Sequence, residues 1–369
     1  MENTKKVIKN KMINVTKSYL PPIEEYVEEI TRIWDTNWLT NYGPLSIELE
    51  NKLKERFDNK NIHYVNNGTV AIEIAINTIV AEDKEEIITT PFSFIATASS
   101  ILWLNKKPIF VDIEKKHFNV DVNKIEEKIS NKTAAMLFVH CFGFPCDVER
   151  IKEIAEKYNL KVIYDAAHCF DVKYNGKYLF SYGDIATCSL HATKVFHTVE
   201  GGLVIVNNEQ YNDKVNAIKN FGNHCGKYEY VGINAKNSEF HAAMGLCILK
   251  NIENIKNRRK KIYNCYTKNL KGLVEIPDIP KNCEYNYIYY PIIFKDEKQL
   301  LMVLKALENE NIYARRYFYP SLNSLGIFHD NNKYENSEDI ASRIACLPLD
   351  SYLSIENAKK ICKIIKEHL

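Results

Sequence analysis

Short apolar runs alternate with helical stretches over residues 63–206, and this alternation limits the possible folds most strongly. Runs typical of β-strands lie at 86–90, 108–113, 134–142, 161–164, 185–190 and 203–206. Stretches with apolar residues at helical spacing lie at 70–80, 120–129 and 148–158. Strands separated by helices predict βαβ units and a mostly parallel sheet. Because the last two runs follow each other closely, we also expect one hairpin-like pairing in that sheet.

Two helices are predicted before this alternation begins. Apolar residues at helical spacing follow Pro21-Pro22 over residues 23–30, which predicts the first helix. Ser46 can cap a second helix that continues through Phe57.

A second, smaller domain is predicted at the carboxyl-terminal end. At 369 residues the chain exceeds the usual size of a single core. A long helix from residue 238 to 255, continued by the charged stretch 256–261, is the expected connection. Strand-like and helical runs then mix, at 287–294, 300–308, 312–317 and 355–367. We expect an N-terminal segment and large domain over residues 1–255 and a small α+β domain over residues 256–369.

Composition and charge argue against several classes of protein. The chain has 49 basic and 47 acidic residues, so no positive field indicates a nucleic-acid partner. No apolar run approaches the roughly 20 residues of a membrane span, and no signal peptide is recognisable. The ten cysteines form no Cys-x-x-Cys pair, which disfavours a metal site and favours free thiols in a reducing compartment. We therefore expect a cytoplasmic protein with no metal, no membrane contact and no nucleic acid.

Lys194 lies just past a strand-like run, between a group of hydroxyl residues and the Gly201-Gly202 turn. A lysine in a packed place loses hydration, which makes its neutral amine easier to reach. Lys194 is therefore a candidate Schiff-base nucleophile. Taken alone, a solvated lysine at a strand end explains the residue better.

The Asn67-Gly68-Thr69 stretch falls between a short strand and a helix. A glycine permits close approach of the backbone, and the free amides of a helix start attract phosphate. An ordinary turn capped by Thr69 is the alternative. The sequence contains neither GxGxxG nor GxxxxGK[ST], which disfavours dinucleotide and ATP sites.

Asp165 ends a buried-looking strand, and His168 follows three residues later. A carboxylate at the carboxyl end of a parallel strand points into the ligand crevice, where it could keep a pyridine nitrogen protonated. His168 could orient a neighbouring oxygen; a helix cap and a core histidine are the alternative. Phosphate cradle, carboxylate and lysine, in this order, are the fixed points that pyridoxal 5′-phosphate requires.

Because these residues occur in this order along the chain, it resembles the DegT/StrS family of pyridoxal-phosphate-dependent nucleotide-sugar aminotransferases. The resemblance covers nearly the whole chain. It includes residues 38–44 (WLTNYGP), 67–69 (NGT), 91–98 (PFSFIATA), 140–143 (HCFG), 165–168 (DAAH), 189–194 (SLHATK), 200–202 (EGG), 232–234 (GIN) and 347–349 (LPL). It implies an α/β fold of the PLP-dependent transferase type I class, with a mostly parallel seven-stranded sheet and a smaller α+β domain.

The resemblance also implies a role for each site residue. Lys194 matches the lysine that binds the cofactor aldehyde, Asp165 the partner of the pyridine nitrogen, and His168 the residue near the 3′ oxygen. The phosphate binders and the aromatic that stacks on the cofactor ring match Gly68, Thr69, Ser189 and Phe94; for Phe94, a core role is the alternative.

Further positions concern the substrate and a second subunit. Asn234 matches an asparagine that reaches the phosphate from the other subunit, which implies a homodimer with a shared site. Arg315 and Tyr319 are candidate substrate contacts, with surface charge and packing as the alternative. Two positions depart from the family, since relatives often carry Arg at position 236 and glycine at position 171, where this chain has Lys236 and Asp171.

The implied reaction moves an amino group from glutamate to a nucleotide-linked keto sugar. The amino-acid sequence around Lys194 is most similar to that of the branch that converts dTDP-4-keto-6-deoxy-D-glucose to dTDP-4-amino-4,6-dideoxy-D-glucose. A 3-keto isomer or a UDP- or GDP-linked sugar stays open. Three other classes remain as alternatives: a 3-dehydratase, against which Lys194 argues because histidine replaces it there, an amino-acid or small-phosphate aminotransferase, and a non-catalytic regulatory protein.

Overall fold

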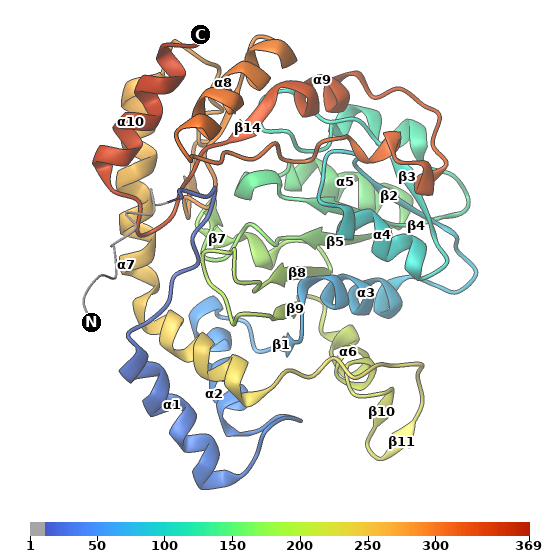
Figure 1. Ribbon diagram of the computed structural model, residues 1–369. Helices are drawn as coiled ribbons and strands as arrows, with labels where there is room; N and C mark the ends of the chain where they lie inside the picture. The colour runs from blue at the N-terminus through green and yellow to red at the C-terminus, as the bar shows by residue number, and fades with distance from the viewer. Residues whose placement is uncertain (1–11) are drawn as a thin grey trace.

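The computed structural model describes residues 12–369 and is built around a seven-stranded sheet (Figure 1). From one edge to the other, the strands are β1 (Ile62–Val65), β9 (Gly202–Val206), β8 (Ile185–Ser189), β5 (Lys161–Asp165), β4 (Thr133–Val139), β2 (Glu86–Thr89) and β3 (Lys107–Phe110). Strands β8, β5, β4, β2 and β3 pair in parallel, whereas β9 is antiparallel to both its neighbours. The mostly parallel sheet and the predicted hairpin between residues 185 and 206 are both confirmed.

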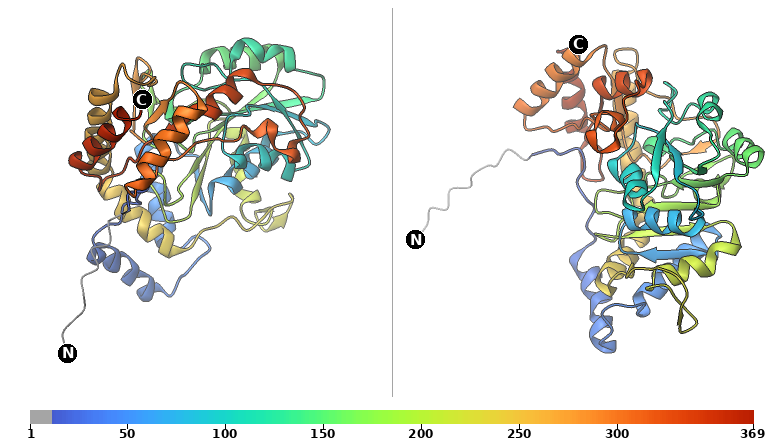
Figure 2. Two further views of the ribbon diagram at one scale, coloured as in Figure 1. Left: turned by 45° about the horizontal axis from the view of Figure 1, so that its top comes forward. Right: turned by 90° about the vertical axis from the view of Figure 1, so that its right-hand side faces the viewer.

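The sheet is buried on both faces, as its near-continuous apolar strands predict. Successive residues of β2 enter different cores: Ile87 packs with α3 (Gly68–Ile79) and α6 (Asn212–Ile218). Ile88 packs in the core shared with α2 (Pro44–Phe57) and α5 (Val148–Tyr158). Each fully buried isoleucine contributes about 1.5–3 kcal/mol. The layers are visible in the turned views of Figure 2.

The remaining elements connect these layers or build the small domain. Helices are α1 (Ile23–Thr36), α4 (Ile95–Trp103), α7 (Glu239–Leu270), α8 (Glu297–Asn309), α9 (Glu335–Arg343) and α10 (Ile355–Lys366). Short strands are β6 (Lys173–Tyr174), β7 (Lys177–Tyr178), β10 (Asn223–His224), β11 (Lys227–Tyr228), β12 (Cys283–Glu284), β13 (Pro291–Ile293) and β14 (Ile344–Cys346). The proposed division at residue 255 falls within α7, which runs through it without a break.

Two predicted elements are wrong. Residues 120–129 do not form a helix: Val120 forms an extended bridge to Ile113, and residues 122–124 and 126–128 form two single 3₁₀ turns. Residues 312–317 do not form a strand, because only isolated bridges to Ile13 and Cys346 hold them. The small domain nevertheless mixes strands and helices, with β13 antiparallel to β14.

The predicted cap of α2 is also wrong. The helix begins at Pro44, with Gly43 as its N-cap and no capping side chain on either residue. Instead the buried carboxylate of Glu239 accepts hydrogen bonds from Leu45 N (2.6 Å) and from Ser46 N (3.1 Å) and Oγ (2.5 Å). A charge-assisted bond of this kind is stronger than a hydroxyl cap, so the first turn of α7 fixes the start of α2.

Asp171, where relatives often carry glycine, adopts the left-handed conformation that glycine favours, with φ of 64°. Its carboxylate is buried and accepts hydrogen bonds from Arg56 Nε and Lys256 Nζ, each at 2.7 Å. These bonds tie α2 and α7 to the loop that follows β5, which offsets the cost of the backbone conformation.

The N-terminal segment, defined here as residues 12–22, runs from the small domain to the start of α1 (Figure 1). Ile13 bridges to Ile312, and the amide of Leu349 donates to the carbonyl of Val15 at 3.0 Å. Tyr19 stacks on Tyr352, with ring centroids 5.9 Å apart.

None of the helices between residues 12 and 369 is long and apolar enough to cross a membrane. All ten cysteines are free thiols, and most of them are buried.

Candidate active site

A cavity of about 290 Å³ lies at the carboxyl ends of β4, β5 and β8. Most of the predicted site residues line it: Gly68, Thr69, Phe94, Asp165, His168, Ser189, Lys194 and Arg315. Two predicted residues, Asn234 and Tyr319, lie outside its wall. Strand ends of a parallel sheet meet at one edge, and this brings residues from distant parts of the chain into one cavity.

Lys194 lies in the loop that joins β8 to β9, residues 190–201. Backbone bonds close this loop, from Leu190 N to Gly201 O at 2.8 Å and from Thr198 N to Leu190 O at 3.0 Å. Phe196 is fully buried and stacks on Phe170, with centroids 4.2 Å apart. Burial lowers the pKa of Lys194, so its neutral, nucleophilic form is reached at lower pH than that of a solvated lysine.

Asp165 is the last residue of β5 and is buried. Burial raises the pKa of its carboxyl group, while hydrogen bonds from Thr97 and the amide of Ala167 oppose that rise. Thr97 Oγ1 donates to Oδ2 at 2.7 Å, and Ala167 N donates to Oδ1 at 3.1 Å. Thr97 lies on α4, and the hydroxyl of Ser93 is in turn 2.7 Å from that of Thr97. Sequence reasoning included both in the family motif but assigned them no role.

His168 is buried beside Asp165, and its ring meets Tyr289 edge-on with centroids 5.0 Å apart. The amide of Phe142 donates to Nδ1 at 3.1 Å. Burial holds the pKa of His168 well below its usual value. The imidazole is therefore neutral, with its proton on Nε2, and can donate one hydrogen bond.

The first turn of α3 forms a cradle for an anion. Asn67 caps the helix by accepting from Val70 N at 2.8 Å, and the first amides of a helix have no partner inside it. A Cβ on Gly68 would lie 2.8 Å from Cβ of Ser189. Only glycine allows this approach, which brings the helix start and the Ser189 hydroxyl to one side of the cavity.

The aromatic wall of the cavity comes from both domains. Phe94 is 54% exposed although it lines the cavity, so one face of its ring is available to a flat ligand. Tyr289 and Tyr317 of the small domain also line the cavity, and the Arg315 guanidinium lies 4.8 Å from the centroid of the Tyr317 ring. Sequence reasoning missed both tyrosines, because nothing in their spacing distinguishes them from core aromatics.

Tyr319 and Asn234 face elsewhere. The ring of Tyr319 lies under the Arg316 guanidinium, 3.3 Å from it, and outside the cavity. Asn234 is exposed and bridges to Asn220 on the segment after α6. Their assignments stay predictions, and that of Asn234 requires a second copy of the chain.

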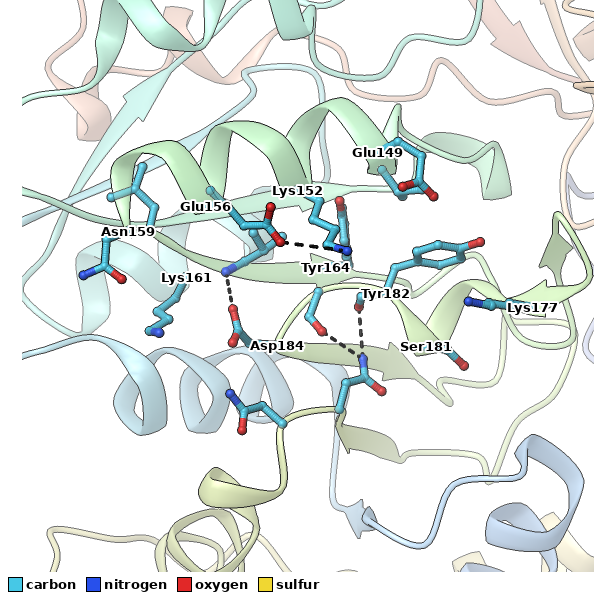
Figure 3. Close-up of a pocket in the computed structure, with 17 residues that line it drawn as sticks. Glu149, Lys152, Glu156, Asn159, Lys161, Tyr164, Lys177, Ser181, Tyr182 and Asp184 are labelled. Atoms are coloured by element: carbon cyan, nitrogen blue, oxygen red, sulfur yellow. Dashed lines mark hydrogen bonds and ion pairs between the residues drawn. The ribbon is translucent and has the colours of Figure 1, made fainter.

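A second cavity, of about 530 Å³, lies at the amino ends of β5 and β8 (Figure 3). Its charged lining residues are Glu149, Lys152, Glu156, Lys161, Lys177 and Asp184. Lys152 faces Glu156 at 3.9 Å, and both are 69% exposed. Asp184 accepts a hydrogen bond from the amide of Val162 at 2.9 Å. None of the predicted site residues is here, and no cluster that could hold a metal occurs among residues 12–369.

Known proteins resemble the chain over nearly its whole length. It is 39% identical to a dTDP-4-amino-4,6-dideoxy-D-glucose transaminase of Shigella dysenteriae, across 97% of this chain and 99% of the relative. It is 32% identical to a GDP-perosamine synthase of Escherichia coli O157:H7, across 93% and 94%. The solved structure of DesI in the presence of its TDP-sugar product superposes with a TM-score of 0.91 at 25% identity, across 98% and 93%. Residues 22–366 match the pattern of one family, and the chain belongs to it: the DegT/DnrJ/EryC1/StrS aminotransferase family.

Proposed function

We propose that this chain uses pyridoxal 5′-phosphate to move an amino group from glutamate to a nucleotide-linked keto sugar. The observation that carries the proposal is one cavity lined by the Lys194 amine, the Asp165 carboxylate and the Gly68–Thr69 helix start. These groups fit the cofactor in kind: an amine for its aldehyde, a buried anion for its pyridinium and amides for its phosphate. The Gly68 cradle, which a Cβ would fill, supports the fit.

When bound, the cofactor supplies an aldehyde that takes up the amino group and a ring that accepts an electron pair. Asp165 holds a proton at the pyridine nitrogen, because an adjacent anion favours the cation. The Lys194 amine, neutral at lower pH through burial, moves a proton at the reacting carbon as general base and then as general acid. Phe94 would offer a flat face to the ring, and His168 Nε2 would donate a hydrogen bond to the 3′ oxygen.

The substrate we favour is dTDP-4-keto-6-deoxy-D-glucose, and the product dTDP-4-amino-4,6-dideoxy-D-glucose. The name of the Shigella relative, at 39% identity, and the sequence around Lys194 both support this branch. A GDP-linked keto sugar is the second candidate, favoured by the 32% identity to a GDP-perosamine synthase. Arg315, which is exposed at the cavity wall, would contact an anionic part of the substrate.

A homodimer would complete the site. Asn234 is exposed and outside the cavity of its own chain, as expected of a residue that serves a partner subunit. Exposed apolar residues, which are enriched at protein interfaces, surround this segment: Phe221, Tyr228, Tyr230, Val231 and Ile233.

The decisive experiment incubates the protein with the cofactor, glutamate and a panel of dTDP-, UDP- and GDP-linked keto sugars. NMR of the product then locates the new amine. We expect amination at C4 of the dTDP-linked 4-keto sugar. An amine at C3, or turnover of only a UDP or GDP sugar, would move the chain to another branch. No transfer to any sugar, with protein that stays colourless, would favour a regulatory role.

A further inference from the structure

His197 is a buried polar residue that the proposed mechanism does not use. It lies three residues after Lys194 and is 1% exposed. Its Nε2 is 2.7 Å from the carbonyl oxygen of Tyr19, and the amide of Val199 donates to Nδ1 at 3.2 Å. A carbonyl only accepts and an amide only donates, so the proton must be on Nε2. Burial lowers the pKa of His197, which keeps this neutral form.

The bond to Val199 holds an unfavourable backbone conformation in the Lys194 loop. Val199 has a φ of 67°, a region that β-branched residues rarely adopt and that costs of order 1–3 kcal/mol. This turn directs the chain to Glu200, which lines the same cavity as Lys194. His197 thus supports the part of the loop that returns to the site.

The bond to Tyr19 connects the same loop to the small domain. Beyond the Tyr19 stack, the Tyr352 hydroxyl joins the N-terminal segment twice, accepting from Leu20 N at 3.0 Å and lying 3.1 Å from Leu20 O as donor. The small domain in turn supplies Arg315 and Tyr317 to the cavity wall. Contacts therefore run from the Lys194 loop through His197 and residues 19–20 to the domain that supplies Arg315 and Tyr317 to the cavity wall.

We propose that His197 is a positioning residue: it fixes the Lys194 loop to the N-terminal segment and thereby sets the burial of the Lys194 amine against the small domain. The proposal rests on the proposed role of Lys194 but concerns the protein before any cofactor binds. Without the Tyr19 bond, the loop loosens and water reaches the amine. The pKa of Lys194 then moves up, towards that of a solvated lysine.

The test compares two replacements of His197, each of which keeps one of the two hydrogen-bonding positions of the imidazole. His197→Asn keeps an acceptor near Nδ1 and loses the donor to Tyr19, whereas His197→Gln keeps a donor near Nε2. In cofactor-free protein, reductive methylation with formaldehyde over a pH series, followed by peptide mass spectrometry, gives the titration midpoint of Lys194. We expect the Asn variant to raise that midpoint by roughly half a unit or more and the Gln variant to restore it.

Hydrogen exchange of residues 15–20 gives the second readout. Loss of one hydrogen bond should speed their exchange about fivefold in the Asn variant but not in the Gln variant. If both variants match the wild type in both readouts, the proposal is wrong. Since neither readout needs the cofactor or turnover, a chain that fails to transfer amino groups can still pass this test.

Tyr352→Phe keeps the test decisive if the Asn variant does not fold. It removes the hydroxyl that joins Leu20 but leaves His197 and the cavity wall intact. We expect the Lys194 midpoint to rise here too, by less than in the Asn variant. An unchanged midpoint, with faster exchange of residues 15–20, would show that the segment does not position the lysine.

Discussion

The two cavities lie at opposite ends of β5 and β8 and treat their charged residues differently. At the carboxyl ends, Asp165 and His168 are buried. Burial raises the pKa of Asp165 and lowers the pKa values of His168 and Lys194. At the amino ends, where the cavity is larger, Lys152 and Glu156 form an ion pair that is exposed to solvent. Cavity volume alone therefore does not identify the candidate site, because buried groups with shifted pKa values are more typical of catalysis than solvated ion pairs.

The largest expected effect is that of Lys194→Ala, which removes the amine that we propose moves the proton. We expect the rate of 2-oxoglutarate formation from glutamate to fall at least about 10²–10⁴-fold, the usual contribution of a positioned acid–base group. Lys177→Ala, at the wall of the larger cavity, is the matched control and should keep the wild-type rate. An equal loss in both variants would contradict the assignment of the active site to the smaller cavity.

The next largest effect is that of Asp165→Asn, which keeps the size and removes the charge. We expect a loss of about a hundredfold in kcat, because the developing charge on the ring is no longer stabilised. Asp184→Asn removes a carboxylate at the other end of the sheet, and its amide oxygen can still accept from Val162. Steady-state rates should separate the two; a fully active Asp165→Asn protein would contradict the assigned role.

Gly68→Ala tests the anion cradle. The new Cβ would lie 2.8 Å from Cβ of Ser189, and such overpacking costs about 1–3 kcal/mol. Cofactor titration followed by absorbance should therefore show weaker binding. Gly326→Ala is the control, since a Cβ there meets nothing within 4 Å; equal affinities in the two variants would count against the cradle.

Asp171→Asn tests a buried carboxylate that lies outside the candidate site. Burial alone would raise the pKa of Asp171, but the bonds from Arg56 and Lys256 outweigh it and lower the pKa. Its contribution is therefore present above the unfolded pKa of about 3.9 and is lost as pH falls through the lower folded pKa. We expect the variant to lose about 1–2 kcal/mol near pH 7 with unchanged kcat. Denaturant titrations at pH 7 and pH 3 should show that difference shrinking in acid; a pH-independent difference would contradict it.

The smallest effect is expected for Lys152→Gln in the larger cavity. An exposed ion pair contributes little, so stability should change by no more than about 0.5 kcal/mol. Denaturant unfolding measures this directly. A loss of several kcal/mol, or of activity, would show that the larger cavity has a role of its own.

The positions of residues with a local sequence signal could be predicted. Contacts between residues that are far apart in the chain could not. Asp165 and Lys194 follow apolar strands, and Gly68 begins a helix after one, so pattern and spacing placed them at one edge. Glu239, which caps a helix 193 residues earlier, has no local signal for that role. Thr97 likewise acts only through its bond to the Asp165 carboxylate.

The misassigned segments show the same limit. Residues 120–129 have helical spacing, but Val120 forms an extended bridge and only two single 3₁₀ turns follow it. Residues 312–317 are apolar and aromatic like a strand, yet they pair only through isolated bridges. In both cases tertiary contacts outweigh local propensity.

Among the seven sheet strands, β9 alone runs in the opposite direction to the other six. As a result, the peptide bearing Lys194 departs from and re-enters the sheet at one rim, without crossing its width. Both ends of this peptide are therefore fixed by adjacent strands of one sheet, and no crossover connection separates the lysine from the sheet.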